Sequence, residues 1–154
     1  MSERDPMKDE EVKEKVMTRQ KALFLCNNNS CRSQMAEGFL RAEAPDSFEA
    51  FSAGSEPTHV HPMAIEVMRE VGIDISGQRS KSVSVFDGWT FDYVITVCEG
   101  NACPFFVGEI GLSLVWSFED PAEVSGTDDE VLGVFRKVRD EIKDSMQRFV
   151  AQYG

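Results

Sequence analysis

Short apolar runs alternate with amphipathic segments along most of this 154-residue chain, and this alternation restricts the fold more than any other feature. The apolar runs predict strands, and the segments with apolar residues at helical spacing predict helices. The predicted strands are 21–26, 48–52, 91–98 and 112–118, and the predicted helices are 33–44, 62–71 and 128–150. Such an alternation favours an α/β fold with a parallel sheet that is covered on both faces.

Length and composition indicate one domain over residues 21–152, preceded by a charged N-terminal extension over residues 1–20. No apolar run approaches the roughly 20 residues that span a bilayer, and the N-terminus has no apolar signal segment, so we expect a cytoplasmic protein. The net charge of −11 disfavours nucleic acid and anionic membranes as partners, and it favours a monomer. A small oxyanion stays compatible with this charge, because a local nest of backbone N–H groups can bind it.

The segment CNNNSCRS, residues 26–33, lies between the first predicted strand and the first predicted helix. Its backbone N–H groups and the helix start suit a tetrahedral oxyanion, and Arg32 can hold two of its oxygens. The same field favours a thiolate nucleophile at Cys26, to which Ser33 could donate a hydrogen bond. Asn28 and Asn29 suit positions with positive φ. The predicted oxyanion-binding residues are Asn27, Asn28, Asn29, Ser30, Cys31 and Arg32.

A reducing compartment disfavours a scaffold of structural disulfides. The four cysteines are therefore metal ligands, catalytic thiols or buried apolar residues. Cys98 and Cys103 follow a predicted strand, with the same spacing as Cys26 and Cys31. Two such pairs could hold a structural zinc ion, but zinc does not require an arginine in the loop. We therefore expect Cys31 to pack under the loop and predict no metal site.

Asp120 precedes Pro121 after the last predicted strand, and a carboxyl group there could act as a general acid over the oxyanion. The alternative is an ordinary Asp-Pro turn. His59 and His61 are expected to be surface or helix-capping residues. In a parallel sheet the segments that follow Cys26, Cys98 and the last strand converge at one edge.

These segments resemble the low-molecular-weight protein tyrosine phosphatases, and still more closely the thioredoxin-coupled arsenate reductases on the same fold. The resemblance runs through CNNNSCRSQMAEGFLR, FSAGSEPTHVHPMAIEVMREVGIDISGQRSKS, VITVCEGNACP, WSFEDPA and FRKVRDEI, and covers about residues 21–150. It implies a three-layer sandwich around a four-stranded parallel sheet. It also implies that Cys26 is the nucleophile, Arg32 the oxyanion ligand and Asp120 the general acid. Asn29 braces the loop, Ser52 supports it, and Asn28 replaces the family's usual glycine, which predicts backbone strain there.

The resemblance further implies a thiol relay. Cys26 attacks arsenate, Cys98 then attacks Cys26 and releases arsenite, and Cys103 closes a Cys98–Cys103 disulfide that thioredoxin reduces. This scheme needs no organic cofactor. The implied function is an arsenate reductase with an arsenate or phosphate-like oxyanion as its ligand, while glutaredoxin and mycothiol stay open as reductants.

Two other functions stay open. A phosphatase of phosphotyrosine or of small esters would use the same loop and leave Cys98 and Cys103 idle. However, the segment AEVSGTDD after Pro121 lacks the aromatic residues with which such phosphatases hold a substrate ring. A redox-sensing or oxyanion-binding module would form its disulfide once, without recycling.

Lys81 lies, by the same resemblance, where some reductases keep an acidic group near a monovalent-cation site, so its ammonium group would replace the cation. Trp89, Trp116, Phe105 and Phe106 are expected in the core, and the two phenylalanines could also help to dock thioredoxin.

Overall fold

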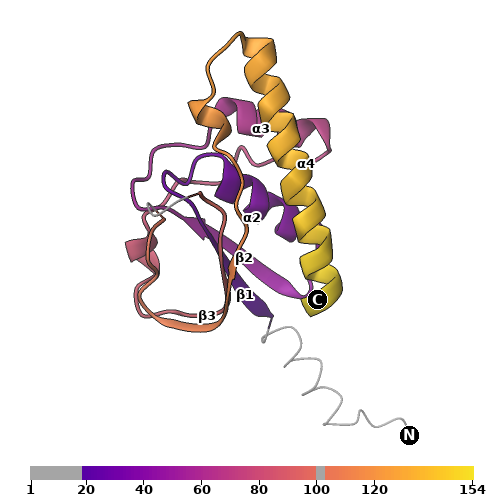
Figure 1. Ribbon diagram of the computed structural model, residues 1–154. Coiled ribbons are helices and arrows are strands. Elements are labelled where there is room, and N and C mark those ends of the chain that lie inside the picture. The colour runs from indigo at the N-terminus through magenta and orange to yellow at the C-terminus, as the bar shows by residue number, and fades with distance from the viewer. Residues whose placement is uncertain (1–18, 100–102) are drawn as a thin grey trace, which may run out of the picture.

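The computed structural model describes residues 19–99 and 103–154, and four strands that all run parallel form its central sheet (Figure 1). They are β1 (Gln20–Leu25), β2 (Phe48–Ala53), β3 (Thr90–Thr96) and β4 (Glu109–Val115), in the spatial order β2-β1-β3-β4. The α/β class and the four-stranded parallel sheet are thus confirmed. The boundaries of β4 differ from the predicted range 112–118, because this strand pairs with β3 from Thr90↔Glu109 to Thr96↔Val115.

The two faces of the sheet are covered in different ways. Alternation along β1 directs Ala22 and Phe24 to one face, and Leu23 and Leu25 to the other. The first face carries the main core with α2 (Arg32–Glu43), α3 (Pro62–Glu70) and α4 (Asp128–Tyr153). The second face lies under the 3-10 helix η1 (Val83–Phe86) and a cluster of aromatic rings. The rings of this cluster belong to Phe51, Phe86, Trp89, Phe91 and Phe106.

The predicted core positions of the aromatic residues are only partly correct. Trp116 packs against Phe24 at the main core, and Phe106 packs against Phe91. Trp89 is 40% exposed and Phe105 is 88% exposed, so the expectation that both belong to the core is wrong. A ring at the end of a short connection can reach solvent even when its neighbour in sequence is packed.

Local sequence signals account for the ends of the helices. Pro62 occupies the first turn of α3, where its missing N–H has no intrahelical partner in any case. Thr127 caps α4, and Glu130 completes a reciprocal capping box. None of the helices in the described ranges is long and apolar enough to cross a membrane. Most of the expected extension, residues 1–18, lies outside the described residues, and Gln20 already belongs to β1.

Parallel pairing brings the carboxyl ends of the strands to one edge of the sheet. Cys26 follows β1, Cys98 follows β3 soon after Thr96, and Asp120 lies in the segment after β4. Since β1 and β3 are neighbours, Cys26 and Cys98 leave the sheet side by side. The topology therefore determines which chemical groups can meet.

Gly54 follows β2 and lies directly against the loop that begins at Cys26. A Cβ atom on Gly54 would lie 2.6 Å from the Asn27 carbonyl oxygen and 2.7 Å from the Cys26 carbonyl oxygen. These are backbone atoms and cannot yield as a flexible side chain does. We predict that Gly54→Ala lowers the free energy of unfolding by about 1–3 kcal/mol, as measured by urea denaturation.

Gly133→Ala is the matched control for this substitution. Gly133 lies within α4, and a Cβ atom there meets no heavy atom within 4 Å. Alanine should raise helix stability at that position by up to about 1 kcal/mol. Equal effects of the two substitutions would contradict the close approach of Gly54 to the loop.

Candidate active site

A tight loop joins the end of β1 to the start of α2, and Asn29 holds its shape. Asn29 is the one non-glycine residue in the described ranges with positive φ, at 48°. Its Oδ1 accepts hydrogen bonds from Gln34 Nε2 at 3.0 Å and from the Lys81 backbone N at 2.8 Å. Its Nδ2 donates to Ser33 Oγ at 2.8 Å. One buried amide thus connects the loop, α2 and the segment before η1.

Asn28 does not share this conformation. The expectation of positive φ and of strain at Asn28 is wrong, since Asn29 alone takes the left-handed turn within the described chain. The Asn28 side chain instead donates to the Glu56 carbonyl oxygen at 3.0 Å. A glycine is therefore not needed at Asn28 for this loop to close.

Cys26 is 2% exposed, and its Sγ lies 2.8 Å from Ser33 Oγ. Because Asn29 Nδ2 already donates to that oxygen, the Ser33 hydroxyl hydrogen is available to point at the sulfur. This geometry gives the sulfur a hydrogen-bond donor from the first turn of α2.

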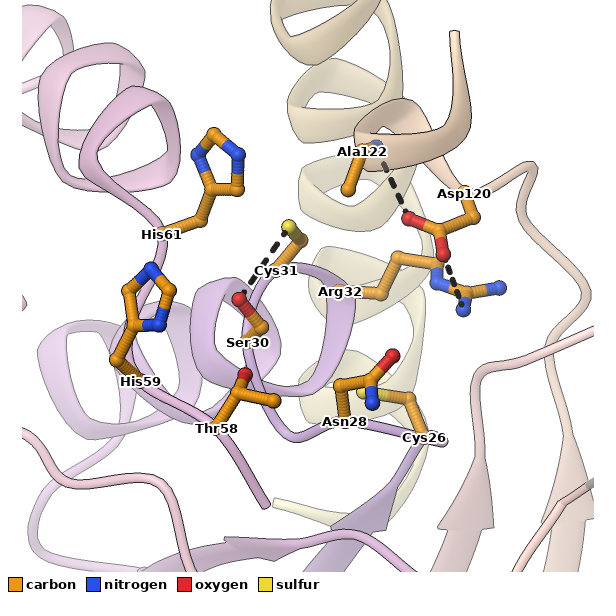
Figure 2. A pocket seen from close by; sticks show the side chains of 10 residues that line it. All are labelled: Cys26, Asn28, Ser30, Cys31, Arg32, Thr58, His59, His61, Asp120 and Ala122. Carbon is orange, nitrogen blue, oxygen red and sulfur yellow. Dashed lines mark hydrogen bonds and ion pairs between the residues drawn. The ribbon is translucent and has the colours of Figure 1, made fainter. Parts of the chain in front are cut away.

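Arg32 and Asp120 lie next to each other at one side of the pocket, opposite His59 and His61 (Figure 2). Arg32 Nη1 donates to the Phe118 carbonyl oxygen at 3.0 Å, and Nη2 lies 3.5 Å from Asp120 Oδ2. Asp120 Oδ1 accepts from the Ala122 N–H at 3.0 Å, which fixes the carboxyl group at the start of the 3-10 helix η2 (Pro121–Glu123). Arg32 Nε is buried and has no partner among the described residues. It therefore keeps an N–H group for an incoming acceptor oxygen.

These groups surround an open pocket of about 250 Å³. Its lining comprises Cys26, Asn28, Ser30, Cys31, Arg32, Thr58, His59, His61, Asp120 and Ala122. Asn27 and Asn29, which were expected to bind the oxyanion through their backbone N–H groups, are not among these lining residues. Thr58 and the two histidines were missed as pocket residues, because they reach it from a segment far away in sequence.

Cys31 lines the pocket and also begins α2, so it does more than pack under the loop. Burial raises the pKa of Cys31 to about 12, and the negative charge of Asp120 acts in the same direction. Cys31 consequently stays a neutral thiol over the working pH range. Of the two free cysteines among the described residues, Cys26 has the shorter hydroxyl contact, at 2.8 Å to Ser33 Oγ, whereas Cys31 Sγ lies 3.9 Å from Ser30 Oγ.

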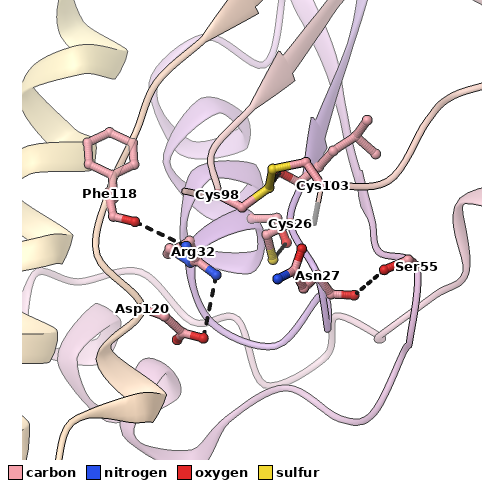
Figure 3. The surroundings of a disulfide bond; sticks show 10 residues. Cys26, Asn27, Arg32, Ser55, Cys98, Cys103, Phe118 and Asp120 are labelled. Carbon is pink, nitrogen blue, oxygen red and sulfur yellow. Dashed lines mark hydrogen bonds and ion pairs between the residues drawn. A yellow bond between two sulfur atoms is a disulfide. The ribbon is translucent and has the colours of Figure 1, made fainter. Parts of the chain in front are cut away.

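Cys98 and Cys103 are joined by a disulfide, with their Cα atoms 6.1 Å apart (Figure 3). Cys98 is 2% exposed, and the disulfide lies next to Cys26 at the edge of the sheet. This pairing does not gather four thiolates, as the zinc alternative requires. Residues 19–99 and 103–154 contain no group of three or more His, Cys, Asp or Glu side chains that could hold a metal ion.

Glu37 on α2 forms a buried charged cluster behind the loop. Its Oε1 accepts from Ser52 Oγ at 2.7 Å and lies 3.8 Å from Lys81 Nζ, while Oε2 pairs with Arg41 Nη2 at 2.8 Å. Burial lowers the pKa of Lys81, and the charge of Glu37 opposes this effect. Lys81 Nζ also donates to the Arg79 carbonyl oxygen at 2.7 Å. The ammonium group thus occupies an oxygen-rich position beside the loop.

The sequence profile of the low molecular weight phosphotyrosine protein phosphatases matches residues 21–153. The chain is 42% identical over 135 residues to an arsenate reductase of Shouchella clausii, covering 86% of this chain and 96% of the relative. It is 40% identical to a glutaredoxin arsenate reductase of Synechocystis, covering 86% and 97% of the two chains. A solved arsenate reductase in a phosphate-binding state aligns with a TM-score of 0.74 and 39% identity, over 88% of this chain and 99% of that one.

The fold, the loop and the similarity to these relatives place the chain among small α/β proteins with a Cys-x5-Arg loop. The chain belongs to the low molecular weight phosphotyrosine protein phosphatase family. The relatives named above are arsenate reductases within that family.

His61 gives the first pH-dependent prediction for this site. Its Nδ1 accepts from the Met63 N–H at 3.1 Å and caps α3, as expected. Burial lowers the pKa of His61, the neighbouring His59 adds to this, and Asp120 opposes it. Because the pKa of His61 is lower in the folded state than in the unfolded state, the fold is more stable when His61 is neutral. Its contribution is complete above the unfolded value of about 6.5 and is lost as the pH falls through the folded value.

Wild type should therefore lose more stability than His61→Asn when the pH falls from about 7 to about 5. Asparagine can cap α3 but does not titrate. Urea denaturation at several pH values measures the difference, and His59→Asn is the control on the exposed neighbour. An equal loss in wild type and His61→Asn would contradict this role.

Lys81 gives a second prediction, on monovalent cations. If its ammonium group takes the place of a cation beside Glu37, potassium should not change the melting temperature of the wild type at constant ionic strength. In Lys81→Asp, by contrast, the melting temperature should rise when potassium replaces tetramethylammonium. Lys137→Asp, at an exposed ion pair with Glu119, is the charge-matched control. A potassium response as large in the wild type as in Lys81→Asp would disprove the substitution of cation by lysine.

Proposed function

We propose that this protein is an arsenate reductase that converts arsenate to arsenite through a relay of Cys26, Cys98 and Cys103, recycled by thioredoxin. The observation that carries the proposal is the Cys98–Cys103 disulfide beside the Cys26 loop. Ester hydrolysis needs only the loop, whereas a reductase must also pass two electrons to its oxyanion. Relatives at about 40% identity that are named arsenate reductases support the same reading.

In the first step the Cys26 thiolate attacks arsenic, and an S–As bond replaces an As–O bond. Asp120 supplies the proton with which the departing oxygen leaves as water. Arg32 and the loop N–H groups bind the remaining oxygens, and Arg32 Nε is available as one donor. Arg32 and Asp120 both line the pocket, so both can reach the oxygens of a bound oxyanion.

In the second step the Cys98 thiolate attacks the Cys26 sulfur. The S–As bond breaks, its electron pair reduces arsenic, and arsenite leaves as the Cys26–Cys98 disulfide forms. The Cys103 thiolate then attacks Cys98, which closes the Cys98–Cys103 bond and frees the Cys26 thiolate. The pairing in this structure, with Cys26 free and Cys98 bonded to Cys103, corresponds to the end of that sequence.

Thioredoxin would then reduce the final disulfide through its own pair of thiols. Phe105 lies two residues beyond Cys103, and its 88% exposure offers an apolar contact for such a partner. The reducing cytoplasm that maintains thioredoxin is the location that this chemistry requires. We also propose that the protein acts as a monomer, since one chain supplies all three thiols.

Phosphatase activity is a second candidate, because the pocket and the family profile suit phosphate esters as well. In η2 the acid Asp120 is followed by Pro121, Ala122 and Glu123, and none of these can stack on a substrate ring. Any such activity should therefore be residual and confined to small esters.

The test is NADPH oxidation in a mixture of the protein, thioredoxin and thioredoxin reductase, with and without arsenate. Oxidation should depend on arsenate and should vanish in Cys26→Ser, Cys98→Ser and Cys103→Ser. Cys103→Ser should still release one equivalent of arsenite and stop as a Cys26–Cys98 disulfide, while it retains any hydrolysis of an aryl phosphate.

Two results would overturn the proposal. Arsenate-independent oxidation together with efficient hydrolysis of the aryl phosphate would identify a phosphatase. A wild type that releases one equivalent of arsenite and cannot be recycled would identify a sensing or binding module.

A further inference from the structure

Asn27 carries a buried hydrogen-bond acceptor that lacks a donor. Its Oδ1 atom is buried and has no partner among the described residues. The neighbouring amides are occupied, since Asn28 bonds to Glu56 and Asn29 bonds to three groups. The backbone oxygen of Asn27 is also paired, with the Glu56 N–H at 2.9 Å. A buried acceptor without a donor costs about 1–3 kcal/mol, so its presence needs an explanation.

The oxyanion does not explain it. Asn27 does not line the pocket, and a carbonyl oxygen would repel an ionised oxyanion. Figure 3 shows the Asn27 side chain on the other side of the loop, next to Cys26, with its amide oxygen directed towards the Cys98–Cys103 bond. Cys26 Sγ, which is also nearby, already has Ser33 Oγ as its hydrogen-bond partner, so the neighbouring atoms that gain new donors on reduction are the two sulfur atoms of the disulfide.

A disulfide sulfur carries no hydrogen, whereas reduction creates two S–H groups. Cys98 Sγ lies 3.8 Å from the Leu25 carbonyl oxygen, which already accepts from the Val97 N–H at 2.9 Å. The Leu25 carbonyl oxygen therefore already has a hydrogen-bond donor. Asn27 Oδ1, which has no donor among residues 19–99 and 103–154, can gain one when the bond opens.

We propose that Asn27 is a positioning residue that raises the reduction potential of the Cys98–Cys103 disulfide, because its amide oxygen accepts an S–H hydrogen bond only in the dithiol state. Reduction breaks the S–S bond, and each sulfur takes one electron and one proton from the two thiols of the reductant, which closes its own disulfide. The hydrogen bond then satisfies Asn27 Oδ1 and stabilises the reduced form. The disulfide is accordingly easier to reduce than it would be beside an apolar side chain.

Asn27→Leu tests this directly, because leucine has nearly the same shape and no acceptor. The Cys98–Cys103 couple is equilibrated in buffers of reduced and oxidised dithiothreitol, and the dithiol fraction is counted by alkylation and mass spectrometry. We expect the equilibrium constant for reduction to fall about tenfold, which corresponds to about 30 mV towards more negative potential. Asn27→Ala, which adds no bulk, should shift it in the same direction.

Ser55→Ala is the matched control. Ser55 Oγ donates to the Asn27 backbone oxygen at 3.3 Å, so this change touches the same residue but leaves its amide in place. Its potential should equal that of the wild type. As a spectroscopic check, the S–H stretching band of the reduced wild type should lie at lower frequency than that of reduced Asn27→Leu.

Equal potentials in wild type, Asn27→Leu and Asn27→Ala would overturn the inference, as would a shift of the same size in Ser55→Ala. The effect of Asn27 on the reduction potential depends on the proposed relay only for its role in the cell. The equilibrium is measured without arsenate, so a potential that depends on Asn27 in a protein that does not reduce arsenate would refute the proposed function and leave this inference intact.

Discussion

The buried amide of Asn29 is the interaction on which the rest of the site depends. One side chain bonds Ser33 and Gln34 of α2 and the backbone of Lys81, while its own backbone takes the left-handed turn at φ 48°. Because Asn29 is completely buried, each of these bonds lies in a low-dielectric environment where a missing partner is costly. The bond from Asn29 to Ser33 leaves the hydroxyl hydrogen of Ser33 available to point at Cys26.

The parallel sheet provides the second constraint. It brings Cys26, the Cys98–Cys103 disulfide and Asp120 from three separate strand ends to one edge. Each of these groups is supported from a different direction: Cys26 by Ser33, Asp120 by Ala122, and Arg32 by the Phe118 carbonyl oxygen. The three groups are therefore held in place by rigid elements of the fold.

Nearby charges and burial determine the electrostatics of the site more than the net charge of the chain does. The whole chain carries a net charge of −11, yet the pocket is lined by Arg32, by residues of the loop and by two imidazoles. Burial raises the pKa of Cys31, so the second loop thiol stays neutral and adds no negative charge near Cys26. At the back of the loop, Lys81 and Arg41 balance the buried carboxylate of Glu37. Short-range pairing thus outweighs the distant net charge.

The sequence by itself determined the alternation of strands and helices, the Cys-x5-Arg loop and the helix starts at Pro62 and Thr127. These are local signals, since periodicity, caps and loop spacing act within a few residues. Only the tertiary structure decided that Asn29 and not Asn28 takes the turn, that His61 and Thr58 reach the pocket, and that the Asn27 oxygen lies against the disulfide. Each of these depends on which backbone from a distant part of the chain packs against the loop, and no local pattern encodes that contact.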